Sequence, residues 1–138
     1  MYRSKHFSIE ELVPPELIGL LHEDVLWKMF DPDLLKSIDK LKEVFDVGSI
    51  SINTFKWSGN RTQSGLRTIG SKYYSKGSMH SVGKAIDCVF SAYTTEEVRE
   101  YILDNPDEFA EIGRIEEASW LHIDTKPRVD GKILVFKP

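Results

Sequence analysis

The clearest periodic pattern lies in residues 31–46, DPDLLKSIDKLKEVFD, where apolar residues recur every three or four positions. That spacing gathers them on one face of an α-helix. Asp31 can cap such a helix, and Pro32 suits its first position, where no N–H is needed. We therefore expect a helix that buries one apolar stripe, formed by Leu34, Ile38, Leu41 and Phe45.

The preceding segment, residues 8–30, has a weaker helical pattern. Pro14 and Pro15 interrupt it, because proline lacks the N–H that a helix interior requires. Ser8 and Glu11 have the spacing of a capping box, which marks the start of a helix. The pattern predicts two short helical pieces here, so that residues 1–47 form a helical N-terminal part.

After residue 48 the pattern changes to the alternation that is typical of strands. A helix is expected only at residues 94–103, where Thr94 and Glu97 form a second capping box. Residues 56–81 are rich in Gly, Ser and aromatic residues and have no periodicity, and a loop this long in a small domain is usually functional. The expected strands are 49–55, 84–90, 111–115, 119–125 and 132–137.

These elements predict an α+β fold in a single domain, residues 1–138, with a small and mainly antiparallel sheet in residues 48–138. The N-terminal helices should pack on one face of that sheet. The chain has a net charge of −4, which gives no general basic surface and argues against a nucleic-acid partner. Its single cysteine, Cys88, excludes an internal disulfide. No apolar run is long enough for a signal peptide or a membrane span, and we expect a monomer.

Strand alternation brings together polar residues from two of the expected strands. In residues 84–90, Ile86 and Cys88 belong to the apolar face, so Asp87 points the other way. In residues 119–125 the same reasoning separates Leu121 and Ile123 from His122. Asp87 and His122 can therefore face one cavity if the two strands are neighbours.

A second histidine lies close to Asp87 along the chain. Gly83 permits a sharp turn, so that His80 can return from the long loop to the same cavity. Two imidazoles and one carboxylate form the ligand set of a catalytic zinc, which keeps its fourth position for water or substrate. Such an ion lowers the pKa of bound water to about 7.

The residues around these candidates strengthen the metal hypothesis. The stretch SMHSVGKAID, residues 78–87, resembles the SxHxxGxAxD motif of zinc D-Ala-D-Ala carboxypeptidases and L-alanyl-D-glutamate endopeptidases. SWLHID resembles the second motif of that family, and SGLR resembles its SGYR segment. The resemblance covers residues 48–126 and implies a hedgehog and D-Ala-D-Ala peptidase-like fold. It also implies Zn²⁺ as cofactor, held by His80, Asp87 and His122.

A general base must take a proton from the attacking water. Many members of the family carry a carboxylate three residues before the last histidine, but this chain has Ser119 there. Hedgehog domains, which share the fold, place a glutamate six residues before that histidine, and this spacing selects Glu116. Glu117 stays open as the alternative, because a β-bulge would exchange the two.

Other residues are candidates for substrate binding. Arg67 resembles the family arginine that holds a substrate carboxylate, and Arg61 is its local competitor. Ser78 can hydrogen-bond a ligand or the substrate, and Trp120 can line the site beside His122. Asp124 can orient a metal-binding histidine, and aromatic residues of the long loop can wall a groove: Trp57, Tyr73 and Tyr74.

The resemblance implies a zinc metallopeptidase that hydrolyses a peptide bond in peptidoglycan stem peptides, as phage endolysins and virion-associated lysins do. Such a lysin accumulates in the host cytoplasm before it reaches the cell wall, or travels in the virion. Two alternatives stay open. One is a catalytically inactive metal-binding structural or virion protein with the same fold, and the other is a D-Ala-D-Ala dipeptidase.

Overall fold

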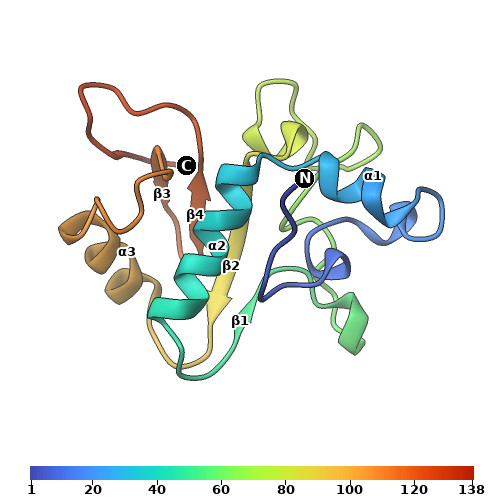
Figure 1. Cartoon of the computed structure of the whole chain (residues 1–138), viewed down its shortest axis with the longest axis horizontal. Coiled ribbons are helices and arrows are strands. Elements are labelled where there is room, and N and C mark those ends of the chain that lie inside the picture. Colours follow the sequence, from blue (N-terminus) through green and yellow to red (C-terminus); the bar gives the residue numbers. More distant parts are fainter.

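The computed structural model describes all 138 residues as an α+β fold with three α-helices and a five-stranded sheet (Figure 1). The strand order in the sheet is β1-β2-β4-β3-β5, and three strand pairs are antiparallel while β3 and β5 are parallel. The prediction of an α+β fold with a mainly antiparallel sheet is confirmed. The helices are α1 (Glu23–Lys28), α2 (Pro32–Val44) and α3 (Thr95–Asp104), and the strands are β1 (Ile50–Ser51), β2 (Ala85–Phe90), β3 (Arg114–Glu117), β4 (Leu121–Asp124) and β5 (Leu134–Phe136).

Helix α2 forms where the apolar periodicity predicted it. The Asp31 carboxylate accepts a hydrogen bond from the Asp33 N–H, and Pro32 occupies the first turn. The predicted stripe is buried, and it joins one hydrophobic cluster with the apolar side of the sheet. Figure 1 shows α2 lying across the sheet, so one N-terminal helix covers a face as predicted.

The segment before α2 is less helical than its pattern predicted. Residues 9–11 and 15–17 form only single 3-10 turns, and α1 has 6 residues. Pro14 is held in extended conformation, and Gly19 has a positive φ of 79°, so neither piece can continue as an α-helix. The expected capping contact does form, because the Ser8 N–H donates to the Glu11 carboxylate over 2.7 Å.

The predicted strand at residues 49–55 is wrong beyond Ser51. After Ser51 the backbone N–H groups form hydrogen bonds outside the sheet. The Asn53 N–H donates to the Glu11 carbonyl, and the Thr54 N–H donates to the Arg61 carbonyl. β1 is therefore a two-residue edge strand on β2. These contacts tie the N-terminal part and the start of the long loop to the sheet.

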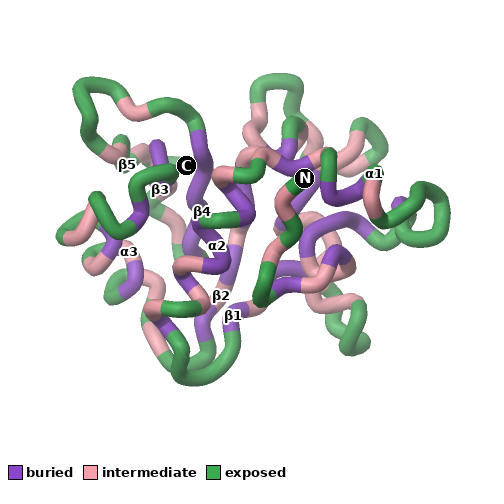
Figure 2. The backbone as a smooth tube through the Cα atoms, in the orientation of Figure 1, coloured by how far each residue is buried: buried purple, intermediate pink, exposed green.

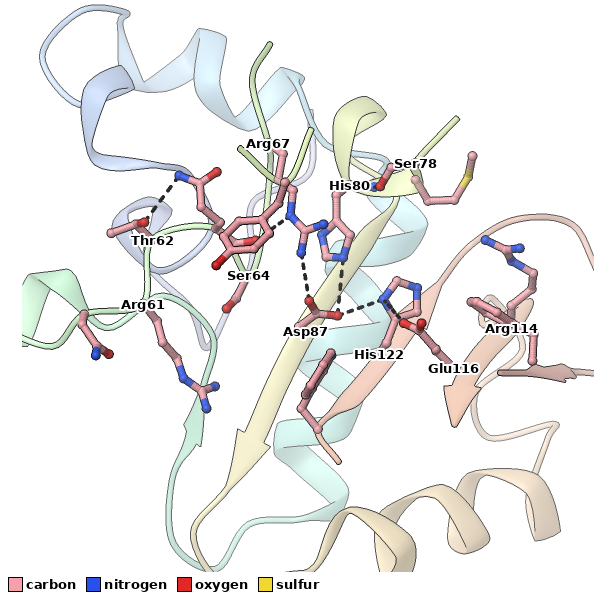
Figure 3. A pocket seen from close by; sticks show the side chains of 16 residues that line it. Arg61, Thr62, Ser64, Arg67, Ser78, His80, Asp87, Arg114, Glu116 and His122 are labelled. Carbon is pink, nitrogen blue, oxygen red and sulfur yellow. Dashed lines mark hydrogen bonds and ion pairs between the residues drawn. The ribbon is translucent and has the colours of Figure 1, made fainter. Parts of the chain in front are cut away.

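The two faces of β2 and β4 separate as the alternation predicted. Ile86, Cys88, Leu121 and Ile123 are buried in the hydrophobic core. The buried stretches of β2 and β4 are purple in Figure 2. Asp87 projects from the opposite face, which the long loop between β1 and β2 borders (Figures 1 and 3). Apolar packing on one face thus leaves the other face for polar residues.

The remaining elements also lie close to their predicted places. Thr94 and Glu97 form a capping box at the start of α3, and the boundaries of β3 and β5 differ from the predicted ones by a few residues. The longest helix has 13 residues, and no helix combines the length and apolarity that crossing a membrane requires.

Candidate metal centre

Three neighbouring strands place one carboxylate, one imidazole and a second carboxylate in a row. In the antiparallel pairing of β2 with β4, Asp87 lies directly opposite His122. In the pairing of β3 with β4, Glu116 lies opposite the same histidine. Because cross-strand partners point to the same face, all three side chains project into one pocket (Figure 3).

His80 reaches this row from a 3-10 turn, Met79–Val82, at the end of the long loop. Ser78 caps the turn by accepting a hydrogen bond from the His80 N–H over 3.2 Å. Gly83 ends it with a φ of 70°, and a Cβ at Gly83 would lie 2.0 Å from the Met29 carbonyl oxygen. The glycine therefore serves both the turn and a close backbone contact.

The ring of His80 is oriented by a backbone group. Its Nδ1 lies 2.9 Å from the Gly65 carbonyl oxygen, which can only accept, so Nδ1 carries the proton. Its Nε2 is the ring nitrogen that faces the site, and it lies 3.4 Å from Asp87 Oδ1. A backbone carbonyl behind a histidine is the usual outer partner of a metal-binding imidazole.

The ring of His122 is held from both sides. Its Nδ1 lies 2.8 Å from Asp87 Oδ1, and its Nε2 lies 3.3 Å from Asp124 Oδ2. Burial alone would lower the pKa of His122, but the hydrogen bonds to Asp124 and Asp87 outweigh burial and raise that pKa to about 9. Asp124, which is fully buried, therefore fixes the ring so that Nδ1 faces Asp87 and Glu116.

Two arginines hold the carboxylates of the site. Arg67 donates from its guanidinium to Asp87 Oδ2 over 3.1 Å, and Arg114 forms a two-pronged pair with Asp124, with a shortest distance of 2.7 Å. Burial would raise the pKa of Asp87, but its hydrogen bonds to His122 and His80 hold that pKa well below the usual range. Asp87 is therefore an ionised ligand candidate with Oδ1 turned toward both histidines.

One possible ligand atom from each of His80, Asp87 and His122 lies within 4.8 Å of the others. This group can hold a metal ion: two imidazoles with oriented rings and one ionised carboxylate suit zinc or another divalent cation of similar hardness. The three residues thus meet as the sequence predicted.

The two candidate bases have different surroundings. Glu116 lines the pocket, and its Oε2 lies 3.7 Å from His122 Nδ1. Glu117 is exposed, pairs with Leu121 in the strand register, and does not line the pocket. β3 is regular here, so no bulge brings Glu117 into the site.

The pocket has a volume of about 740 Å³, which is a common size for a small-molecule or peptide site. Of the other predicted residues, Arg67, Ser78, Trp120 and Tyr73 line it, whereas Trp57 and Tyr74 do not. Arg114 and Phe136 also line it and were missed by the sequence reasoning. Strand alternation could have found Arg114, because it lies two residues before Glu116 on the same face.

Comparison with known proteins gives no further guide: no family model, no curated protein and no solved structure matches this chain. The resemblance of its short motifs to zinc peptidases therefore stays a prediction. The case for a functional site rests on the geometry of the pocket itself.

Proposed function

We propose that this protein is a zinc-dependent peptidase that hydrolyses a peptide bond in the stem peptides of bacterial peptidoglycan. The observation that carries the proposal is the convergence of His80, Asp87 and His122, with Glu116 beside them, on one face of an open pocket. Metal-assisted hydrolysis requires metal ligands and a nearby carboxylate that can carry a proton, and this pocket contains candidates for both. The resemblance of SMHSVGKAID and SWLHID to zinc peptidase motifs supplies the substrate class.

His80 through Nε2, His122 through Nδ1 and Asp87 through Oδ1 would hold the zinc ion. When bound, the ion supplies Lewis acidity and a water of lowered pKa. Asp124 and the Gly65 carbonyl keep the two rings oriented, and Arg67 keeps Asp87 turned toward them. These contacts preorganise the ligand set before any metal binds.

Glu116 is the proposed general base. Its carboxylate accepts a proton from the attacking water and returns it to the nitrogen of the leaving amine. It lies on the same face as the ligand candidates, and no hydrogen bond or ion pair to an arginine or lysine occupies it. Ser119, at the position of the carboxylate found in many zinc peptidases of this kind, is exposed and takes no part in the pocket.

The test combines metal analysis with cleavage. We expect one zinc ion per chain in purified protein and the release of new amino groups from purified sacculi. Glu116→Gln should keep the zinc and lower the rate about 10²- to 10⁴-fold, because the proton transfer loses its carrier. Glu117→Gln is the matched control and should leave both properties unchanged.

Other outcomes select the alternatives. Bound zinc without any cleavage by the unaltered protein would favour an inactive metal-binding structural or virion protein. Hydrolysis of free D-Ala-D-Ala but not of sacculi would favour a dipeptidase. A full rate in Glu116→Gln together with an inactive Glu117→Gln would refute the assignment of the base.

A further inference from the structure

Three arginines line the pocket, and two of them are committed to other residues of the protein. Arg67 donates to Asp87 and to the Gln63 carbonyl, over 3.1 and 2.8 Å. Arg114 pairs with Asp124 and lies over the ring of Phe136, 4.4 Å from its centroid. Both guanidiniums are held by carboxylates that orient the metal-ligand candidates, so a substrate carboxylate bound there would share its donors with Asp87 or Asp124.

The third arginine, Arg61, has a different environment. Its backbone is fixed on both sides by Thr54, because its N–H donates to Thr54 Oγ1 over 3.1 Å and its carbonyl accepts from the Thr54 N–H over 3.0 Å. A Cβ at Gly59 would lie 2.3 Å from Thr54 Oγ1, so the loop closes tightly around Thr54. The Arg61 guanidinium itself has no hydrogen bond, ion pair or aromatic partner, although it lines the pocket.

The position of Arg61 suits an extended ligand. Figure 3 shows Arg61 on one side of Asp87, with Glu116 and Arg114 on the other side. A peptide that crosses the metal-ligand candidates would therefore have one end near Arg61. At this end the loop also contains Gln63 Oε1, a buried side-chain oxygen without a hydrogen-bond partner. An unpaired cation and an unpaired acceptor on one loop provide partners for a carboxylate and an amide N–H.

With a metal bound, the charge of the pocket favours an anionic ligand. Arg114 is neutralised by its pair with Asp124, so Arg61 and Arg67 balance Asp87 and Glu116, and a bound divalent cation would make the pocket positive. The chain as a whole has a net charge of −4, so this positive excess is local. A concave site of one sign raises the local concentration of ligands of the opposite sign.

From these contacts we infer that Arg61, and not Arg67, binds a carboxylate of the peptide substrate. Arg67 is instead a positioning residue that keeps Asp87 oriented. The inference rests on the proposed peptidase function, and it adds that the substrate must carry a free carboxylate on the Arg61 side of the scissile bond. A guanidinium can bind such a group with two parallel hydrogen bonds.

The experiment compares three synthetic stem pentapeptides, L-Ala-γ-D-Glu-L-Lys-D-Ala-D-Ala: the parent, the C-terminal amide, and the form with the D-Glu carboxylate amidated. Cleavage is followed by chromatography, and binding to the zinc-loaded Glu116→Gln protein is followed by calorimetry. We expect one of the two amides to bind roughly 10- to 100-fold more weakly than the parent, the loss of one charge-assisted pair. When Arg61→Gln is added, the affinity for the parent peptide should fall to that for the amide, so that the protein no longer distinguishes the two peptides.

Two controls separate this inference from the proposed function. Arg3→Gln makes the same change at an exposed arginine that pairs with Asp24 outside the pocket, and it should preserve the discrimination. Arg61→Gln should keep its zinc and its melting temperature, which excludes unfolding. Two results would overturn the role of Arg61 if the unaltered protein cleaves the substrate. One is equal affinity for all three peptides, and the other is a preference for the parent peptide over the amide that survives Arg61→Gln. No cleavage of any peptide or of sacculi would overturn the proposed function instead, and the binding series would still decide whether Arg61 selects a carboxylate.

Discussion

Two aspartates of this protein collect hydrogen bonds from distant segments, with opposite results. Asp39, on α2, is only 2% exposed and accepts from the N-terminal segment: from the Tyr2 hydroxyl over 2.7 Å, the Ser4 hydroxyl over 2.6 Å and the Lys5 N–H over 2.9 Å. Asp87, on β2, faces two imidazoles and the Arg67 guanidinium in an open pocket. One carboxylate fastens a chain end, and the other joins a group that can bind a metal.

The difference lies in the partners. Hydroxyl and backbone N–H groups satisfy Asp39 completely and offer no strong ligand for a cation. Each histidine beside Asp87 has one ring nitrogen that can bind a cation once its proton is lost. The other ring nitrogen is already hydrogen-bonded, in His80 to the Gly65 carbonyl and in His122 to Asp124. Neighbouring side chains, more than burial, therefore decide whether an acidic residue supports folding or chemistry.

The largest expected effect comes from replacing Asp87 and measuring zinc affinity. Asp87→Asn should lower zinc affinity at least about 100-fold, because loss of an outer partner of a ligand alone costs about 10- to 100-fold. The measurement is competition with a chromogenic chelator, with the unaltered protein titrated in parallel. Zinc affinity within tenfold of the unaltered protein would show that Asp87 is no ligand.

The matching change at Asp39 should act on stability instead. Asp39→Asn replaces an acceptor oxygen by a donor in a buried cluster of donors, and it should lower the free energy of unfolding by about 2–4 kcal/mol. Urea denaturation measures this change, and zinc affinity measured on the same folded samples should be unaltered. If zinc binding fell together with stability, the two aspartates would not be independent.

The smallest expected effect concerns Tyr2. Burial, together with the hydrogen bond and charge of Asp39, raises the pKa of Tyr2 to about 12. A raised pKa means that the neutral phenol is favoured in the folded state, so its contribution is complete below about pH 10, the ordinary tyrosine pKa, and is lost as the pH rises toward 12.

Tyr2→Phe should accordingly cost about 1 kcal/mol at neutral pH, the value of a typical hydrogen bond. The gap in unfolding free energy between the two proteins should close between about pH 10 and 12. A gap that stays constant over this interval would mean that the Tyr2 hydroxyl does not titrate in contact with Asp39.

Local patterns in the sequence were enough to predict features that depend on neighbouring residues. The apolar stripe of α2 and the alternation in β2 and β4 follow from the periods of helix and strand, and the same alternation placed Asp87 and His122 on one face. Glu116 was selected only through its spacing from His122 in the resemblance to hedgehog domains, and the structure adds its direct cross-strand pairing with that histidine.

Features that depend on distant partners could not be predicted in this way. Asp39 has no local sign of its role, because its donors lie 33 to 37 residues away along the chain. The early end of β1 depends on Glu11 and Arg61, which take the backbone bonds that a longer strand would need. The commitment of Arg67 to Asp87 is likewise a contact across 20 residues. Only the tertiary structure shows which of these distant groups are hydrogen-bonded to each other.

The contact at Gly83 limits how the protein can be divided. Its carbonyl accepts the Asp31 N–H over 2.9 Å, and its Cα packs against the Met29 carbonyl so closely that no side chain would fit. The turn that delivers His80 is therefore shaped against the junction of α1 and α2, although all the ligand candidates lie after residue 48. An engineer who wished to graft the metal-ligand group onto another scaffold would have to transfer the helical junction with it, since residues 48–138 alone lack the surface against which that turn is set.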